Sequence, residues 1–409
     1  MTADGGRLRL ARQARGLSQQ QLAGMAGVSR QAVSAVESGV SDPSLRVALA
    51  LAQALGTSIE EVFGPAPPSL PVTARPLAPL GEPGSRVALA PVSDAFVALP
   101  LSDATARRAG FAPAGGLVQA AGSGQPEVAG GQAGEQAAGQ ARHLAERQVR
   151  PIGPPRPTLV VAGCDPAMPL LESPLSLLDP PVAFAWWPCG SEEALGLAAA
   201  GLVHAAGAHL RSASGDYNTA AARQLLPGGA EVIGFCAWRE GLVLRPELAG
   251  RLTGIADLLA GGLRLVNREP GAEARHLLDR ELARLGIDPA AVAGYETKAS
   301  GHLEVAAAVA AGLADAGIAS EPAALAYHLA FVPLAAEVFD WVIPAAQNDT
   351  RAVQCLLRVL SSPWLLDQLA NLPGYDPGRC GRHIATLPAA GRRGLARARG
   401  WRPTAPPEG

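Results

Sequence analysis

Lysine is almost absent from this sequence of 409 residues, in which Lys298 stands against 33 arginines. No Gly-Lys-Ser/Thr motif can therefore exist, and a Walker-type phosphate-binding loop is excluded. Cysteine is also scarce, since the five cysteines are widely separated and form no Cys-x-x-Cys pair. That spacing predicts neither a disulfide framework nor a structural zinc site.

Charged residues make up only 17% of the chain, and the formal net charge is −2. Even the most apolar stretches carry charges, as residues 303–319 carry Glu304 and Asp315, so no transmembrane helix is predicted. The first residues lack the apolar region that is typical of a signal peptide. We therefore expect a cytoplasmic protein without a membrane partner, and its length predicts two or three domains.

The clearest local signals lie in residues 17–39, which predict two short helices joined by a turn. Ser18 and Gln21 have the spacing of a capping box, so a helix is expected to begin at Gln19. Ser29 is an N-cap candidate for a second helix that stops near residue 39. Three further helices are expected, over about residues 7–14, 44–55 and 59–63. Their predicted inward-facing side chains include Leu8, Leu10, Leu22, Met25, Val33, Val36, Leu45, Leu49 and Leu55.

This helical pair has the arrangement of a helix-turn-helix, in which the second helix enters the major groove and its first residues reach base edges. Arginine can bond bidentately to guanine and glutamine to adenine, and glutamines at the start of the first helix can bind a phosphate. An ordinary helical hairpin with solvated polar residues is the alternative. The candidate DNA-binding residues are Gln19, Gln20, Ser29, Arg30, Gln31 and Ser34.

The run "LSQQQLAGMAGVSRQAVSAVESGVSDPSLRVALALAQALGTSIEEVF" resembles the phage-repressor-like (XRE-type) helix-turn-helix family of transcriptional regulators. The resemblance implies a DNA-binding domain over residues 1–64 that binds double-stranded operator DNA, usually as a homodimer. These 64 residues hold six arginines and five acidic residues. A phosphate-binding surface must therefore come from arginines gathered on one face.

The segments that follow differ in composition. Residues 65–76 are rich in proline and predict an extended linker. Two β-like runs separated by Ser93 and Asp94 predict a hairpin in a small β-rich connector over residues 77–118. Residues 119–157 predict a low-complexity linker, and residues 386–409 a disordered basic tail.

From Thr158 to about residue 385, short buried strands alternate with helices. This alternation predicts an α/β fold with largely parallel sheets, and the length of the segment predicts two lobes with a cleft between them. Ligands in such folds bind beyond the carboxyl ends of the strands. The candidate ligand-binding residues follow the predicted strands: Cys164, Asp165, Ser214, Asn218, Arg239, Arg268, Arg275, Ser300 and His302.

Several of these segments, among them "VVAGCDPAMPLLE", "HLRSASGDYNTAA" and "LVNREPGAEARHLLDREL", look like the periplasmic-binding-protein-like ligand domain of cytoplasmic regulators, which is related to molybdate-binding proteins. The resemblance implies a two-lobed type II fold over residues 158–385, a ligand in the interlobe cleft and no catalysis. Family members often read Gly-Ser-Gly-Thr-Arg where residues 271–275 read Gly-Ala-Glu-Ala-Arg. Glu273 would repel an oxyanion such as molybdate or tungstate, so the resemblance alone does not decide the ligand. Two classes of ligand remain open: such an oxyanion, and a zwitterionic or cationic organic molecule.

Histidines are the remaining candidates for acid–base or metal chemistry. His204 and His209 do not have the spacing of a helical metal site, and no Gly-x-Ser-x-Gly or His-Glu-x-x-His motif occurs. We therefore predict no metal, no cofactor and no catalysis. The chain is predicted to be a homodimeric, ligand-responsive transcriptional regulator, and the alternative is an enzyme that acts on a small polar substrate in the α/β domain.

Overall fold

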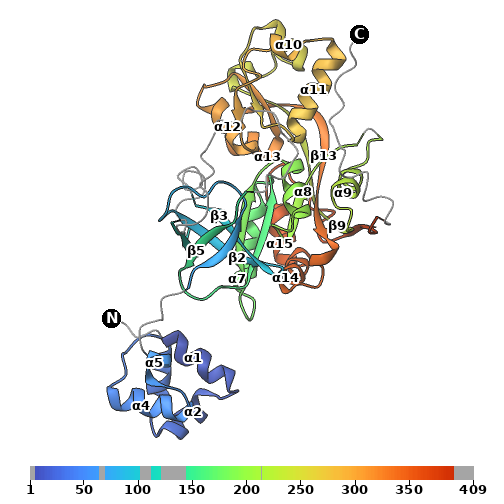
Figure 1. Cartoon of the computed structure of the whole chain (residues 1–409). Coiled ribbons are helices and arrows are strands. Elements are labelled where there is room, and N and C mark those ends of the chain that lie inside the picture. The colour runs from blue at the N-terminus through green and yellow to red at the C-terminus, as the bar shows by residue number, and fades with distance from the viewer. Residues whose placement is uncertain (1–4, 64–69, 102–111, 121–143, 213, 391–409) are drawn as a thin grey trace. The chain divides into compact units, whose positions relative to one another are not determined.

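The computed structural model describes residues 5–63, 70–101, 112–120, 144–212 and 214–390. The chain divides into two compact units, Met1–Leu70 and Pro71–Gly409 (Figure 1). Within the described residues, no helix is long and apolar enough to cross a membrane. The predicted basic tail lies almost entirely outside the described residues.

The first unit consists of five short helices around one small core. Ser18 caps the second helix as predicted, because its hydroxyl accepts the Gln21 N–H while the Gln21 side chain accepts the Ser18 N–H. Ser29 and Ser44 cap the next two helices through their hydroxyls, which accept the Ala32 N–H and the Val47 N–H. The helices are α1 (Gly5–Ala14), α2 (Gln19–Ala26), α3 (Arg30–Glu37), α4 (Leu45–Ala54) and α5 (Ile59–Phe63).

Four of the predicted core residues of this unit are instead exposed. Leu45 and Leu49 on α4 are 71% and 44% exposed, and Met25 and Leu10 are also largely exposed. Leu51 is buried, and Leu49 precedes it by two residues. Because a helix turns by 100° per residue, Leu49 lies about 200° away from Leu51, on the opposite face. The remaining predicted core residues, among them Leu8, Leu22, Val33, Val36 and Leu55, are buried together.

The second unit begins with a closed five-stranded barrel in the order β1-β3-β2-β4-β5. The predicted hairpin across Ser93 and Asp94 is present, but the barrel extends beyond the predicted connector. Its first and last strands lie in segments that were predicted to be linkers, because each supplies alternate inward side chains that complete the barrel core. The strands are β1 (Val72–Pro76), β2 (Arg86–Val92), β3 (Ala95–Pro100), β4 (Gly116–Val118) and β5 (Arg147–Pro151).

The rest of the second unit has two lobes that share one nine-stranded sheet, ordered β11-β10-β12-β9-β13-β8-β6-β7, with β14 paired to β9. Parallel pairs occur at both ends of the sheet, but its middle is antiparallel, so the predicted largely parallel sheet is wrong there. The strands are β6 (Thr158–Gly163), β7 (Ala183–Pro188), β8 (Ala205–Ala208), β9 (Ala230–Leu244), β10 (Leu265–Arg268), β11 (Lys298–Ala299), β12 (Ala316–Ser320), β13 (Ala330–Pro344) and β14 (His383–Leu387).

Helices cover both faces of the sheet in each lobe, as Figure 1 shows. In the first lobe they are α7 (Glu172–Ser176), α8 (Ser191–Ala199), α9 (Thr219–Leu225), α14 (Arg351–Leu360) and α15 (Pro363–Ala370). In the second lobe they are α10 (Ile255–Ala260), α11 (Glu273–Leu285), α12 (His302–Ala310) and α13 (Glu321–Ala326). Short 3-10 turns are η1 (Met168–Leu171), η2 (Pro246–Leu248), η3 (Pro289–Ala291) and η4 (Ala345–Gln347).

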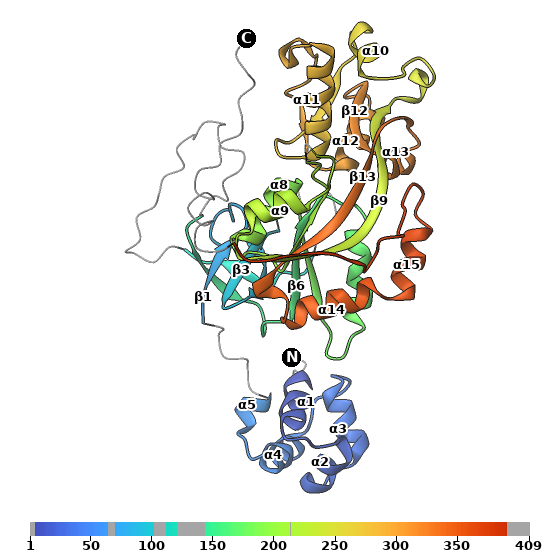
Figure 2. The same ribbon diagram turned by 90° about the vertical axis from the view of Figure 1, so that its right-hand side faces the viewer.

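The two long strands β9 and β13 run side by side through both lobes (Figure 2). One half of β9 pairs with β14 in the first lobe, and the other half pairs with β12 in the second lobe. Side chains near the middle of these strands therefore lie where the lobes meet.

Candidate functional site

Five of the six predicted DNA-binding residues have exposed side chains on α2, on α3 or at their N-termini. Arg30 and Gln31 occupy the first turn of α3, where a recognition helix would face base edges. Ser29 is exposed as well, but its hydroxyl accepts the Ala32 N–H as the helix cap. The exposed residues are Gln20, Ser29, Arg30, Gln31 and Ser34.

Gln19 is half-buried and takes part in a polar network that holds the first three helices together. Its amide donates to Glu37 at 2.8 Å, and Arg12 donates to the same carboxylate at 2.6 Å and 3.1 Å. Burial opposes the charge on Glu37, but the bonds from Arg12 and Gln19 outweigh it and lower the pKa of Glu37. The network fixes the position of α3 relative to α1 and α2.

In the second unit, three of the predicted ligand-binding residues come together with His209, and the four side chains come from both lobes. Cys164 follows β6, His209 follows β8, Arg268 ends β10 and His302 begins α12. The Cys164 sulfur lies 3.2 Å from His209 Nε2 and 3.8 Å from His302 Nε2. Arg268 is fully buried, bonds to both oxygens of Glu269 at 2.8 Å, and places its Nη1 3.4 Å from His302 Nδ1.

Two carboxylates on the shared strands complete this cluster. Glu240 on β9 and Glu337 on β13 have no exposed surface and lie 3.6 Å and 3.5 Å from His209 Nδ1. Burial raises the pKa of Glu240 to about 7 and also raises the pKa of Glu337. Burial opposes the charged form of His209, but Cys164 and then the two carboxylates raise its pKa well above the usual range.

Aromatic rings pack close to the histidines of the cluster. The Trp238 ring lies 5.4 Å from His209 and 6.0 Å from His302, measured between ring centroids, and Phe339 lies 6.1 Å from His209. Two groups of three side chains could each hold a metal ion, because the ligand atoms within each group all lie within 4.8 Å of one another. One group is Cys164, His209 and His302, and the other is His209, Glu240 and Glu337.

Asp165 and Asn218 are buried, but other side chains and the backbone engage them. Asp165 accepts hydrogen bonds from the Ala167 N–H, the Tyr375 hydroxyl and the Cys236 thiol. Asn218 accepts the Leu210 N–H and donates to Asp340 at 2.8 Å. In this conformation both residues brace the loops that follow β6 and β8.

The other four predicted ligand-binding residues lie outside the cluster. Arg239 was expected in a loop, but β9 continues through it, and its exposed side chain forms an ion pair with Glu321. Ser214 and Ser300 are exposed. Arg275 lies over the Tyr295 ring at 4.6 Å and donates to the Arg268 carbonyl.

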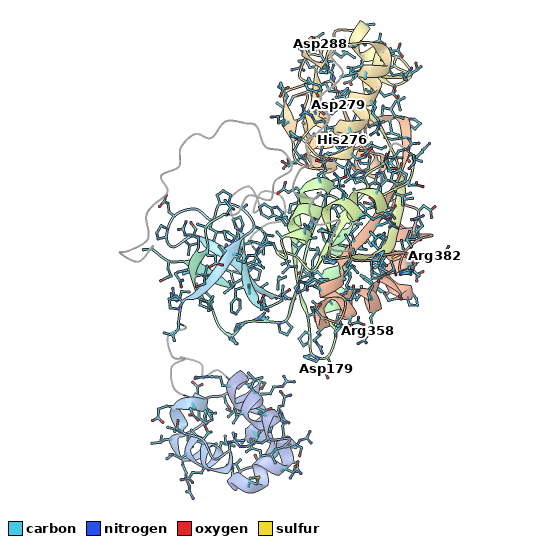
Figure 3. The ribbon with its side chains drawn as sticks, turned by 45° about the vertical axis from the view of Figure 1, so that its right-hand side comes forward. Asp179, His276, Asp279, Asp288, Arg358 and Arg382 are labelled. Carbon is cyan, nitrogen blue, oxygen red and sulfur yellow. The ribbon has the colours of Figure 1, made fainter. Side chains whose placement is uncertain are left out.

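His276 on α11 connects the two lobes (Figure 3). Its Nδ1 lies 3.6 Å from Glu273 Oε2, and its Nε2 lies 3.7 Å from Glu192 Oε1 on α8 of the other lobe. Glu273, which replaces a small residue of the family pattern, also accepts from Arg280 at 2.6 Å and from the Arg211 N–H at 3.3 Å. Its charge is therefore already compensated and contributes to lobe contact.

Sequence reasoning missed the two glutamates at the centre. Their signal is a carboxylate within a long apolar strand, as in "CAWREGLVL" for Glu240 and "LAAEVFDWV" for Glu337. On an ordinary one-sided strand such a residue would face solvent, and only the pairing of β9 and β13 between two lobes buries both.

Comparisons with known proteins match both units. Residues 8–62 match the family model described as Helix-turn-helix, and residues 173–361 match that of the PBP superfamily domain. An uncharacterized HTH-type transcriptional regulator of Methanocaldococcus jannaschii is 47% identical over 47 residues, which are 12% of this chain and 71% of that protein. The uncharacterized protein YvgK of Bacillus subtilis (strain 168) is 32% identical over 178 residues, or 43% of this chain, and the chain spans 57% of that relative's length.

Among solved structures, a restriction-modification controller protein from Aeromonas hydrophila is 44% identical over 15% of this chain and 94% of its own, with a TM-score of 0.15. Both matched families are those of regulators and binding proteins rather than of enzymes. The chain thus belongs to the XRE-type helix-turn-helix transcriptional regulators, and its helix-turn-helix domain is joined to a periplasmic-binding-protein-like α/β domain.

Proposed function

We propose that this protein is a ligand-responsive transcriptional regulator that binds operator DNA as a homodimer through α3 and senses a small ligand between the two lobes of its second unit. The observation that supports the ligand site best is the buried cluster of Cys164, His209, Arg268 and His302. These side chains come from the strand ends of both lobes, so a ligand held there would contact both lobes at once.

The regulatory step requires that the ligand bind the DNA-competent and incompetent states with different affinities. A tenfold change in operator affinity corresponds to a difference of about 1.4 kcal/mol. Because β9 and β13 pass through both lobes, a change in lobe closure must bend these strands near residues 238–240 and 335–337. Closure of the cleft is therefore the proposed source of that difference.

The experiment selects operator DNA from random duplexes with the full chain and then measures its affinity by fluorescence anisotropy. The ligand panel contains molybdate, tungstate, phosphate, amino acids and divalent metal ions. We expect at least one ligand both to raise the melting temperature and to change operator affinity about tenfold or more. Ligands that raise the melting temperature but leave the affinity unchanged would contradict regulation by this unit.

A further inference from the structure

Three buried side chains bring five polar atoms together without a hydrogen-bond partner among the described residues. The atoms are His209 Nδ1 and the four carboxylate oxygens of Glu240 and Glu337. All three side chains have zero exposed surface. Protonated His209 can neutralise only one of the two buried carboxylates, and Arg268 is already paired with Glu269, so a divalent cation in place of that proton would balance the charge of the site.

The distances favour a bare metal ion over an organic ammonium group. Metal–ligand bonds of about 2.1 Å in tetrahedral geometry place ligand atoms about 3.4 Å apart. His209 Nδ1 lies 3.6 Å from Glu240 Oε2 and 3.5 Å from Glu337 Oε2. An ammonium nitrogen that donates hydrogen bonds of about 2.8 Å needs its acceptors about 4.6 Å apart, which is wider than the spacing of these atoms.

Hydrogen bonds decide between the two possible ligand groups. A metal-binding histidine donates its other ring N–H to an acceptor. His209 Nε2 lies 3.2 Å from the Cys164 sulfur, which can accept that bond and leave Nδ1 for the metal. His302 Nδ1 instead accepts the Ser320 N–H at 3.2 Å, so the neutral ring carries its proton on Nε2 and cannot bind a metal there. The group of Cys164, His209 and His302 is therefore disfavoured.

We propose that the second unit binds one divalent first-row transition-metal ion through His209 Nδ1 and the carboxylates of Glu240 and Glu337. The two negative charges would neutralise the ion, and one nitrogen with two oxygen ligands suits Zn²⁺, Co²⁺ or Mn²⁺ better than Ca²⁺, which takes six to eight oxygens. The ligands come from the end of β8 and from the middle of β9 and β13. The metal would thus tie the first lobe to both shared strands, and its regulatory effect rests on the proposed function.

The first test uses the full chain after chelator treatment and measures Zn²⁺ and Co²⁺ binding by equilibrium dialysis and thermal shift. We expect one ion per chain and a metal-dependent rise in melting temperature. Glu240→Gln and Glu337→Gln should each weaken binding about 100-fold or more. Each variant should also lose most of the metal-dependent rise in melting temperature, measured against its own metal-free form, because an ion pair with His209 stabilises the metal-free chain as well. A rise in either variant as large as that of the parent would overturn the proposal.

The second test separates the two ligand groups. His302→Asn keeps an acceptor near the position of Nδ1 and should retain metal affinity. Cys164→Ser removes only the acceptor of the His209 Nε2 proton and should weaken metal affinity only tens of fold. The Co²⁺ spectrum should lack a thiolate-to-cobalt charge-transfer band. Loss of binding in His302→Asn together with such a band would overturn this ligand assignment, as would the absence of any Zn²⁺, Co²⁺ or Mn²⁺ binding. His328→Asn, which replaces an exposed histidine, is the control and should change nothing.

Operator binding then distinguishes this inference from the proposed function. Metal binding that leaves operator affinity unchanged supports the site and counts against metal regulation. Failure to bind metal, with operator affinity that responds to another ligand, overturns the site and leaves the proposed function standing.

Discussion

His204 is a buried histidine whose uncharged ring is part of the fold. Its Nδ1 accepts the Val160 N–H at 3.0 Å, and burial lowers the pKa of His204 to about 4. Because the unfolded chain has the ordinary value near 6.5, its stabilising contribution is complete above about pH 6.5 and is lost as the pH falls toward 4. The shift corresponds to about 3 kcal/mol over that interval.

We expect His204→Asn to flatten this part of the stability profile, since asparagine can keep an acceptor near Nδ1 but does not titrate. Urea unfolding followed by tryptophan fluorescence between pH 4 and 8 measures the effect. His328→Asn is the matched control, because His328 is exposed. An equally steep profile in both variants would show that His204 is not the titrating group.

Arg30 and Gln31 are the residues at which base specificity should be found. Arg30→Ala or Gln31→Ala should cost about 1–3 kcal/mol of specific affinity and relax one operator position each. Gln20→Ala should weaken binding evenly across sequences, because it is expected to contact phosphate. Quantitative footprinting on the selected operator is the measurement, and unchanged footprints in all three variants would contradict the assignment of α3 as the recognition helix.

At the scale of elements, α4 presents an apolar stripe to solvent. Leu45 and Leu49 lie four residues apart on one face and are 71% and 44% exposed. We expect this stripe to form the dimer contact, because one helix-turn-helix covers too little DNA for operator-grade specificity. Leu49→Asp should convert a dimer to a monomer in sedimentation and lower operator affinity, whereas Gln13→Asp, exposed on α1 and outside the stripe, should do neither. A parent protein that sediments as a monomer would refute the dimer.

The barrel closes at a glycine where a larger residue has no space. A Cβ atom at Gly116 on β4 would lie 2.5 Å from Val149 Cγ1 on β5. Gly116→Ala should therefore lower the free energy of unfolding by about 1–3 kcal/mol. Gly196→Ala on α8 is the control: its Cβ would meet no atom within 4 Å, and helix propensity predicts a gain of up to about 1 kcal/mol. Similar values for the two variants would contradict the tight approach of β4 and β5.

What the sequence could predict depends on how local the signal is. The caps at Ser18, Ser29 and Ser44 act within three residues, and each helix begins where its cap predicts. The strands β1 and β5 were hidden because proline-rich and glycine-rich neighbours suggested linkers, while their pairing partner is far away in the chain. For the site, Cys164, Arg268 and His302 follow from strand ends, but Glu240 and Glu337 depend on a register that only the folded sheet reveals.

At the scale of the whole molecule, the two units should unfold separately. All six tryptophans lie between residues 186 and 401, so their fluorescence reports on the second unit alone, while circular dichroism reports on both. Leu22 is fully buried in the first unit, and Leu22→Ala should lower the free energy of unfolding of that unit by about 2–5 kcal/mol. The dichroism transition should shift in its first-unit part, while the fluorescence transition should stay where it is. A fluorescence transition that shifts with it would show that the units unfold cooperatively.

The register of β9 and β13 makes the second lobe an insertion in a β-hairpin. Leu244 and Ala330 face each other as paired residues, and residues 245–329 leave and return to the sheet at this one point. A tight turn between the two could in principle close an uninterrupted hairpin and leave the first lobe and the barrel with their connectivity intact. The second lobe is thus a topologically removable element, whereas the first lobe is built from two separate segments of chain, one on each side of the insertion.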